Sequence, residues 1–110
     1  MDKSTLLEHH ISRAEVAYKS GDTTLALREG RRALEFCDAP SKTVALNIFI
    51  AKCLSKLGKT TASNKIYRAL INEKIYLAPV ISGLLFNHFS QEKNLEKLHT
   101  SLRLMKIFIN

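Results

Sequence analysis

Histidine and cysteine are the side chains of this 110-residue sequence that could ligate a metal or attack a substrate. They are His9, His10, His88 and His99, together with Cys37 and Cys53. On a helix the adjacent His9 and His10 point about 100° apart, so they cannot easily share a metal. His88 and His99 could approach each other across a helical hairpin, but no third ligand stands at a metal-binding spacing. The sequence therefore predicts no metal centre.

Nucleophilic catalysis by cysteine requires a thiolate next to a base, and the sequence offers little support for such a pair. Cys37 and Cys53 form neither a disulfide framework nor a metal-binding motif, so we expect two reduced thiols in or near the core. The Gly-Lys-Thr run at 58–60 matches the end of a phosphate-binding loop, but that motif requires glycine where Cys53 stands. We expect a protein that is not an enzyme and holds no cofactor.

Positive charge is concentrated in the second half of the chain. Residues 1–55 hold 8 Lys/Arg and 7 Asp/Glu, whereas residues 56–110 hold 9 and 3, so the two halves carry +1 and +6. This asymmetry favours acidic partners. Binding of nucleic acid would need exposed aromatic residues between the basic ones or a helix-turn-helix motif, and neither is evident. Nucleic acid is therefore not the expected partner, and a basic nucleic-acid-associated adaptor is the less favoured alternative.

Apolar residues recur at steps of three and four along most of the chain, as at Leu7, Ile11 and Ala14. No segment shows the sustained alternation of a strand, so we expect a single all-α domain over 1–110. The predicted helices lie near 5–19, 23–37, 42–57, 60–73, 78–89 and 91–108. No apolar run approaches the ~18 residues of a membrane span, and the first residues lack the order of a signal peptide. We expect no membrane association and a cytoplasmic protein, with the nucleus as the alternative.

An internal repeat relates the predicted helices. When Gly21 is aligned with Gly58, Ala14 falls on Ala51, and a further shift of 32 residues places Gly83 on Ala51. The offsets of 37 and 32 residues bracket the ~34-residue period of tetratricopeptide repeats. The chain resembles this family, with repeats at about 7–40, 44–75 and 76–108. The resemblance implies three antiparallel helical hairpins stacked as a short α-solenoid.

Small residues at Ala26, Gly30 and Ala33 share one face of the second predicted helix. A glycine inside a helix costs about 1 kcal/mol relative to alanine, so Gly30 needs a packing reason. In the alignment Gly30 falls on Tyr67, where the family usually has an aromatic residue. We expect this face to admit close approach of neighbouring helices.

The resemblance also predicts a partner-binding groove, because the first helix of each tetratricopeptide hairpin lines the inner face of the stack. Carried onto this chain, the groove residues are Ile11, Glu15, Tyr18, Ile48, Lys52, Ser55, Val80, Leu84 and His88. The basic clamp that some family members use for a carboxylate is missing, and the lining is largely aliphatic. Such a groove suits an amphipathic helix of a partner protein. The alternative is that these residues pack against one another and close the groove.

Two protein-binding functions remain open. In its layout the chain resembles the small chaperones of type III secretion needle subunits, which hold an amphipathic helix in a groove. The alternative is a structural subunit of a larger complex, because the run Leu102–Asn110 has apolar residues all around the helix axis. Its predicted docking edge is Leu104, Ile107, Phe108 and Ile109. Apolar exposure at such an edge also predicts self-association of the isolated protein.

Overall fold

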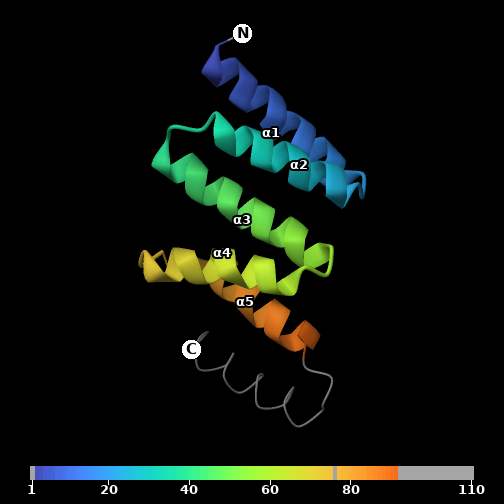
Figure 1. Cartoon of the computed structure of the whole chain (residues 1–110), viewed down its shortest axis with the longest axis vertical. Coiled ribbons are helices and arrows are strands. Elements are labelled where there is room, and N and C mark those ends of the chain that lie inside the picture. Colours follow the sequence, from blue (N-terminus) through green and yellow to red (C-terminus); the bar gives the residue numbers. More distant parts are fainter. Residues whose placement is uncertain (1, 76, 92–110) are drawn as a thin grey trace.

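The structure is a computed structural model that describes residues 2–75 and 77–91, and these fold into five α-helices without any strand (Figure 1). The helices are α1 (Lys3–Lys19), α2 (Thr23–Glu35), α3 (Pro40–Lys56), α4 (Thr60–Asn72) and α5 (Ala78–Gln91). This confirms the all-α class. The sixth predicted helix, 91–108, lies outside the described residues, apart from Gln91, which ends α5. Within the described part, no helix has both the length and the apolar character needed to cross a membrane.

The first four helices repeat with the predicted offset of 37 residues. The bounds of α3 are those of α1 moved from Lys3 to Pro40, and the bounds of α4 are those of α2 moved from Thr23 to Thr60. The helices follow one another in chain order along the long axis of the molecule, with α1 packed on α2, α2 on α3, and α3 on α4 (Figure 1). The fifth helix contacts both α3 and α4.

The two hairpin turns have the same backbone structure. Gly21 and Gly58 have φ angles of 89° and 80°, in the left-handed region that glycine enters without a steric penalty. The amide of Asp22 donates to the carbonyl oxygen of Ala17 at 2.9 Å, and the amide of Lys59 donates to that of Leu54 at 2.8 Å. These are the hydrogen bonds that end a helix at a glycine. The turns thus fall in the gaps between the predicted helices 5–19 and 23–37 and between 42–57 and 60–73.

The first helix begins earlier than the sequence pattern indicates. The capping-box spacing of Thr5 and Glu8 favours a start near residue 5, but the N-cap is Asp2, whose Oδ1 accepts a hydrogen bond from the Thr5 amide at 2.8 Å. This bond holds the pKa of Asp2 below its ordinary value. An aspartate three residues before a free amide is an equally good cap, which explains the shift of the helix start.

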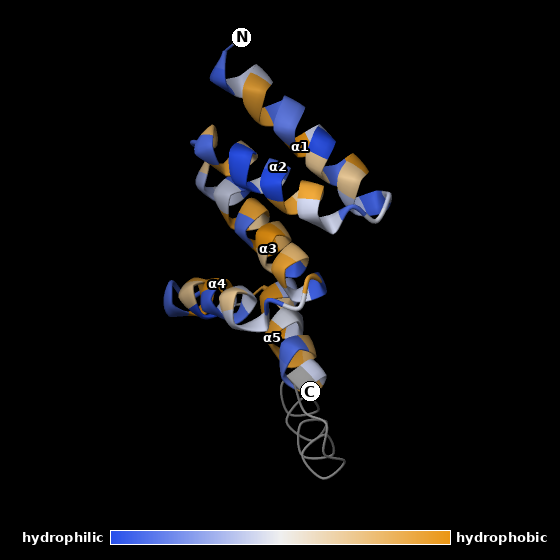
Figure 2. Cartoon of the chain, turned by 45° about the vertical axis from the view of Figure 1, so that its right-hand side comes forward, coloured by the Kyte–Doolittle hydropathy of each residue, from blue (hydrophilic) through white to orange (hydrophobic). Residues whose placement is uncertain are grey.

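Helix α3 forms the centre of the core. Its side chains enter all three clusters of buried apolar residues, which lie between α1, α2 and α3 and between α3, α4 and α5. Figure 2 shows apolar colour along much of α3, whereas α1 and α2 carry more hydrophilic segments. A helix covered by neighbours on several sides needs apolar residues around most of its circumference.

Two helix contacts pair a large side chain with a glycine, in opposite senses. A Cβ at Gly30 of α2 would lie 3.1 Å from Cδ2 of Phe49 in α3. At the contact of α4 with α5, the aromatic residue is Tyr67 and the glycine is Gly83, where a Cβ would lie 2.5 Å from the Tyr67 Oη. Gly30 and Tyr67 occupy equivalent positions of the repeat. At this position α2 has the glycine and its neighbour α3 has the aromatic ring, whereas α4 has the aromatic ring and its neighbour α5 has the glycine. This accounts for the glycine inside α2.

A buried carboxylate joins α1 to α2. Glu29 is buried, and its Oε2 accepts a hydrogen bond from His10 Nδ1 at 2.6 Å while Arg13 Nε lies 3.4 Å from its Oε1. The His10 ring stacks on Phe36 with a centroid separation of 5.7 Å. The hydrogen bond from His10, followed by the charge of Arg13, holds the pKa of Glu29 below its ordinary value against the opposing effect of burial.

We expect Glu29→Gln to lower the free energy of unfolding by about 1–2 kcal/mol near neutral pH, because a charge-assisted hydrogen bond is lost. Since the folded pKa of Glu29 is depressed, its stabilisation is present above the unfolded pKa of about 4.3 and is lost as the pH falls through the folded value. Urea unfolding between pH 5 and pH 3 should therefore show the difference from wild type shrinking. Glu35→Gln, at an exposed ion pair, is the control. A difference that stays constant with pH would contradict this account.

Candidate functional site

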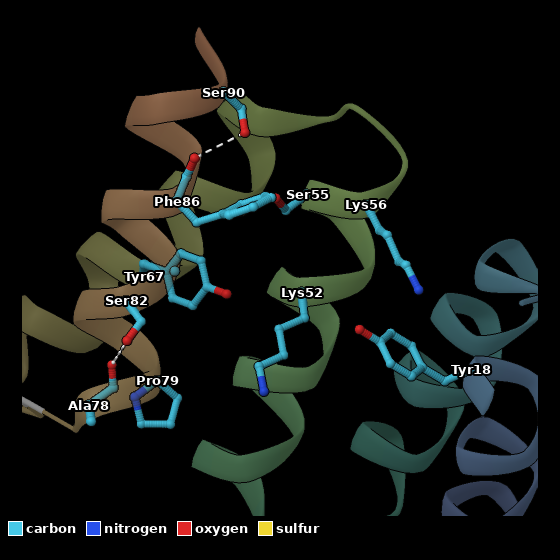
Figure 3. A pocket seen from close by; sticks show the side chains of 11 residues that line it. Tyr18, Lys52, Ser55, Lys56, Tyr67, Ala78, Pro79, Ser82, Phe86 and Ser90 are labelled. Carbon is cyan, nitrogen blue, oxygen red and sulfur yellow. Dashed lines mark hydrogen bonds between the residues drawn. The ribbon is translucent and has the colours of Figure 1, made fainter. Parts of the chain in front are cut away.

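A groove of about 740 Å³ opens between the end of α1, the second half of α3 and α5 (Figure 3). Its lining residues are Tyr18, Lys52, Ser55, Lys56, Tyr67, Ala78, Pro79, Ser82, Gly83, Phe86 and Ser90. We call it the α3–α5 groove. Helices α1, α3 and α5 supply most of its wall, and α4 supplies Tyr67 alone.

Two lysines on α3 carry the positive charge of the α3–α5 groove. Lys52 and Lys56 are four residues apart, so they lie on the same face of the helix, about 6 Å apart along its axis. Figure 3 shows both side chains extending from α3 into the space between α5 and Tyr18. The Lys56 Nζ lies 4.6 Å from the centroid of the Tyr18 ring, which is a cation–π contact.

The hydroxyl of Tyr67 reaches the groove from a buried ring. Tyr67 is 1% exposed, and Figure 3 shows its hydroxyl oxygen directed away from α4 toward Lys52. Burial raises the pKa of Tyr67 above its ordinary value, so the phenol is neutral at physiological pH and can donate a hydrogen bond. The close approach of the ring to α5 depends on the missing Cβ of Gly83.

A buried polar network fixes the wall of the groove. The side chain of Asn87 is buried, and its Nδ2 donates to Ser63 Oγ at 3.0 Å and to Asn64 Oδ1 at 2.7 Å. Its Oδ1 accepts from Ser55 Oγ at 2.5 Å. Ser63 Oγ in turn donates to the carbonyl oxygen of Ala51 at 2.7 Å. The network ties α5 to both α3 and α4, so the two sides of the groove are held at a fixed separation.

One large apolar side chain of the groove is exposed. Phe86 on α5 is 61% exposed, and Figure 3 shows its ring beside Ser55 of α3. Pro79 lies at the other end of the same helix face, beside Lys52. The α3–α5 groove therefore combines an exposed aromatic ring with two ammonium groups and several hydroxyl groups.

The structure brings three of the nine predicted groove residues together in this site: Tyr18, Lys52 and Ser55. Ile11 and Glu15 line a second hollow of about 290 Å³ between α1 and α3. Leu84 is half-buried against the cluster between α3, α4 and α5, and His88 is exposed on α5 without lining the groove.

The prediction of a largely aliphatic groove is wrong at two positions. Ile48 and Val80 are buried, and they pack with Ala51, Tyr67 and Leu70 in the core between α3, α4 and α5. Both side chains lie between these helices, because burial there removes apolar area from water. These two residues therefore follow the alternative prediction, in which the side chains pack against one another. The surface of the groove is formed by aromatic, basic and hydroxyl-bearing side chains instead.

Several groove residues were not predicted as such. Lys56 stands one helical turn after Lys52, and this spacing alone could have included it. The shift of 32 residues that places Gly83 on Ala51 also places Phe86 on Leu54, which is buried, and Tyr67 is equivalent to the packing position Gly30. Asn87, which is buried behind the groove wall, gave no signal either, since a single asparagine in an apolar helix has no characteristic spacing. The predicted docking edge, Leu104, Ile107, Phe108 and Ile109, lies outside the described residues.

The remaining candidates for chemistry are dispersed. Burial raises the pKa of the Cys53 thiol to about 11, so the thiol is protonated at neutral pH and is a poor nucleophile. Cys37 is half-buried, and its Sγ is 3.4 Å from the Thr43 hydroxyl. In residues 2–75 and 77–91, no group of three His, Cys, Asp or Glu side chains is arranged to hold a metal ion.

Comparisons of the chain with known protein families, with curated proteins and with solved structures find no match. The function is therefore inferred from the α3–α5 groove itself.

Proposed function

We propose that this chain is a non-enzymatic protein-binding module that holds an amphipathic segment of a partner in the α3–α5 groove, as a small chaperone or adaptor. The observation that carries this proposal is the exposed ring of Phe86 on the rim of a groove with two lysines. Binding sites are typically concave, with apolar contact area and a few convergent polar groups. An amphipathic helix presents apolar side chains at i, i+3 and i+4, which would cover Phe86 and Pro79.

The proposal includes a tetratricopeptide-like stack in one domain, with the repeats at 7–40, 44–75 and 76–108. The constant offset of 37 residues between α1–α2 and α3–α4, and the shared glycine turns, support it. In such a stack α5 is the first helix of the third hairpin. Helices α1, α3 and α5 then line the inner face, and both hollows lie against them.

Two substitutions of exposed apolar residues test this function. Phe86→Ser should reduce capture of the partner from native lysate by at least about tenfold, because a buried aromatic anchor contributes more than 1 kcal/mol to binding. Val16→Ser is the matched control, since Val16 is a 67% exposed apolar residue on α1 that lines neither hollow. Quantitative mass spectrometry compares the proteins retained by the wild type and by both variants.

Circular dichroism should show equal helix content in the three proteins, because both side chains are exposed. Equal capture by wild type and Phe86→Ser would place the interface elsewhere and overturn the proposal. A loss shared by Phe86→Ser and Val16→Ser would have the same consequence.

A further inference from the structure

No acidic side chain in the described part of the chain pairs with the two ammonium groups of the α3–α5 groove. Among the described residues the ion pairs engage Asp38, Glu8, Glu29 and Glu35, and none of them includes Lys52 or Lys56. Of residues 2–75 and 77–91, no aspartate or glutamate lines the groove. Lys56 contacts the Tyr18 ring, which leaves its charge uncompensated. An anionic group entering the groove would therefore meet two free cations one helical turn apart.

The surroundings of the groove strengthen this field. Residues 52–91 contain six Lys/Arg and one acidic residue, Glu73. Glu73 is exposed at the end of α4 and does not line the groove. Clustered charge of one sign around a hollow attracts ligands of the opposite sign and accelerates their association.

Charge complementarity also distinguishes between occupants. Residues 92–110 of this chain carry four Lys/Arg and two Asp/Glu, so this segment has the same sign of charge as the groove. A second copy carries +7 in total and meets the same repulsion. An acidic segment of another protein satisfies both lysines.

The aromatic residues of the groove favour a peptide over single-stranded nucleic acid. Stacking of bases needs exposed ring faces in succession. The ring of Tyr67 is buried and Lys56 covers the ring of Tyr18, so Phe86 is the groove's one largely exposed aromatic side chain in the described structure. One such ring suits a single apolar side chain of a peptide.

We infer that the α3–α5 groove binds an acidic amphipathic segment of a partner protein, with two carboxylates three or four residues apart facing Lys52 and Lys56. An aromatic or aliphatic side chain of the same segment packs on Phe86, and the Tyr67 hydroxyl donates to a carboxylate. Carboxylates at i and i+4 of a helix repeat at the same spacing of about 6 Å as the two lysines. This inference rests on the proposed protein-binding function.

A displayed library of random 16-residue peptides, selected on the full-length chain, tests the inference. The wild type should enrich peptides that combine Asp or Glu three or four positions apart with an aromatic or aliphatic residue. For the enriched peptides, Lys52→Gln/Lys56→Gln should raise Kd about tenfold, measured by fluorescence anisotropy in low salt. The effect should diminish at high ionic strength. Lys65→Gln/Arg68→Gln removes the same charge from exposed positions of α4 and should change Kd less than threefold.

Each other outcome overturns a defined part of the argument. If the wild type enriches apolar peptides without acidic preference, and Phe86→Ser loses them, the groove binds proteins but the acidic occupant is wrong. If the wild type enriches no peptides other than those that Phe86→Ser also enriches, the protein-binding function fails as well. If Lys52→Gln/Lys56→Gln and Lys65→Gln/Arg68→Gln weaken binding equally, the affinity depends only on net charge and the assignment of the carboxylates to the groove is wrong. Tighter binding of a labelled single-stranded 20-mer than of any peptide, lost in the groove variant, would replace the peptide by nucleic acid.

Discussion

Replacing Asn87 by leucine should lower the free energy of unfolding by about 3 kcal/mol, which is the largest effect we expect from a single substitution in this chain. The amide of Asn87 is 0% exposed and uses both its donor and acceptor groups, on Ser55, Ser63 and Asn64. Leucine has a similar size but cannot form hydrogen bonds. It would leave the half-buried Ser55 hydroxyl and Asn64 carbonyl without their partners, and an unpaired polar group costs about 1–3 kcal/mol when it is buried.

The measurement is urea unfolding together with thermal denaturation followed by circular dichroism. The Tm of Asn87→Leu should fall by on the order of 10 °C. Asn72→Leu is the matched control, because Asn72 is an exposed asparagine at the end of α4, and it should change stability by less than about 0.5 kcal/mol. Equal Tm values for the two variants would show that the network adds nothing to the stability of the contacts between α3, α4 and α5.

The same network decides the shape of the groove. A fully satisfied polar network favours one packing of the helices over packings in which a helix is shifted along its axis, because the shift leaves buried groups unpaired. Ser55 both lines the groove and donates to Asn87, so the position of α5 relative to Lys52 and Lys56 depends on this bond. The sequence did not predict this, since hydrogen bonds between three helices depend on tertiary geometry.

Local sequence signals predicted the positions of the helices well. Periodic apolar residues and the turns at Gly21 and Gly58 predicted the first five helices, and all five start within two residues of the prediction. These signals act over a few residues, so they are readable without the fold. The starts of α1 and α3 differ from the prediction by two residues, because Asp2 is an equally good N-cap and Pro40 is equally suitable as a first helical residue.

The sequence predicted less accurately which side chains face the groove. Ile48 and Lys52 lie one turn apart on α3, and the repeat pattern assigned both to the inner face. In the structure Ile48 is in the core and Lys52 lines the groove. A rotation of a helix by a fraction of a turn exchanges such positions, and the rotation is set by side chains on the neighbouring helices. Tyr67 and Gly83 are an example, because their contact sets how closely α5 approaches α4.

The second large effect is expected at the small-residue face of α2. The sequence predicted that Ala26, Gly30 and Ala33 face a neighbouring helix, and all three are buried in the structure. Ala33 is 0% exposed and belongs to a cluster with Leu7 of α1 and Leu46 of α3. Ala33→Leu inserts three carbon atoms between two helices that both pack on α2. We expect a loss of about 2 kcal/mol in the free energy of unfolding, the usual cost of overpacking.

Urea unfolding of Ala33→Leu should be compared with Ala69→Leu, which makes the same change at an exposed position of α4. Alanine and leucine differ little in helix propensity, so the difference between the variants reports on packing alone. Adding Leu46→Ala to Ala33→Leu restores the total side-chain volume of the cluster, and the double variant should lose less stability than the sum of the two single variants. Additive losses would mean that Ala33 and Leu46 do not share one cavity. A Tm for Ala33→Leu equal to that of Ala69→Leu would contradict the close packing of α2 between α1 and α3, and with it the reason for the small residues on this helix.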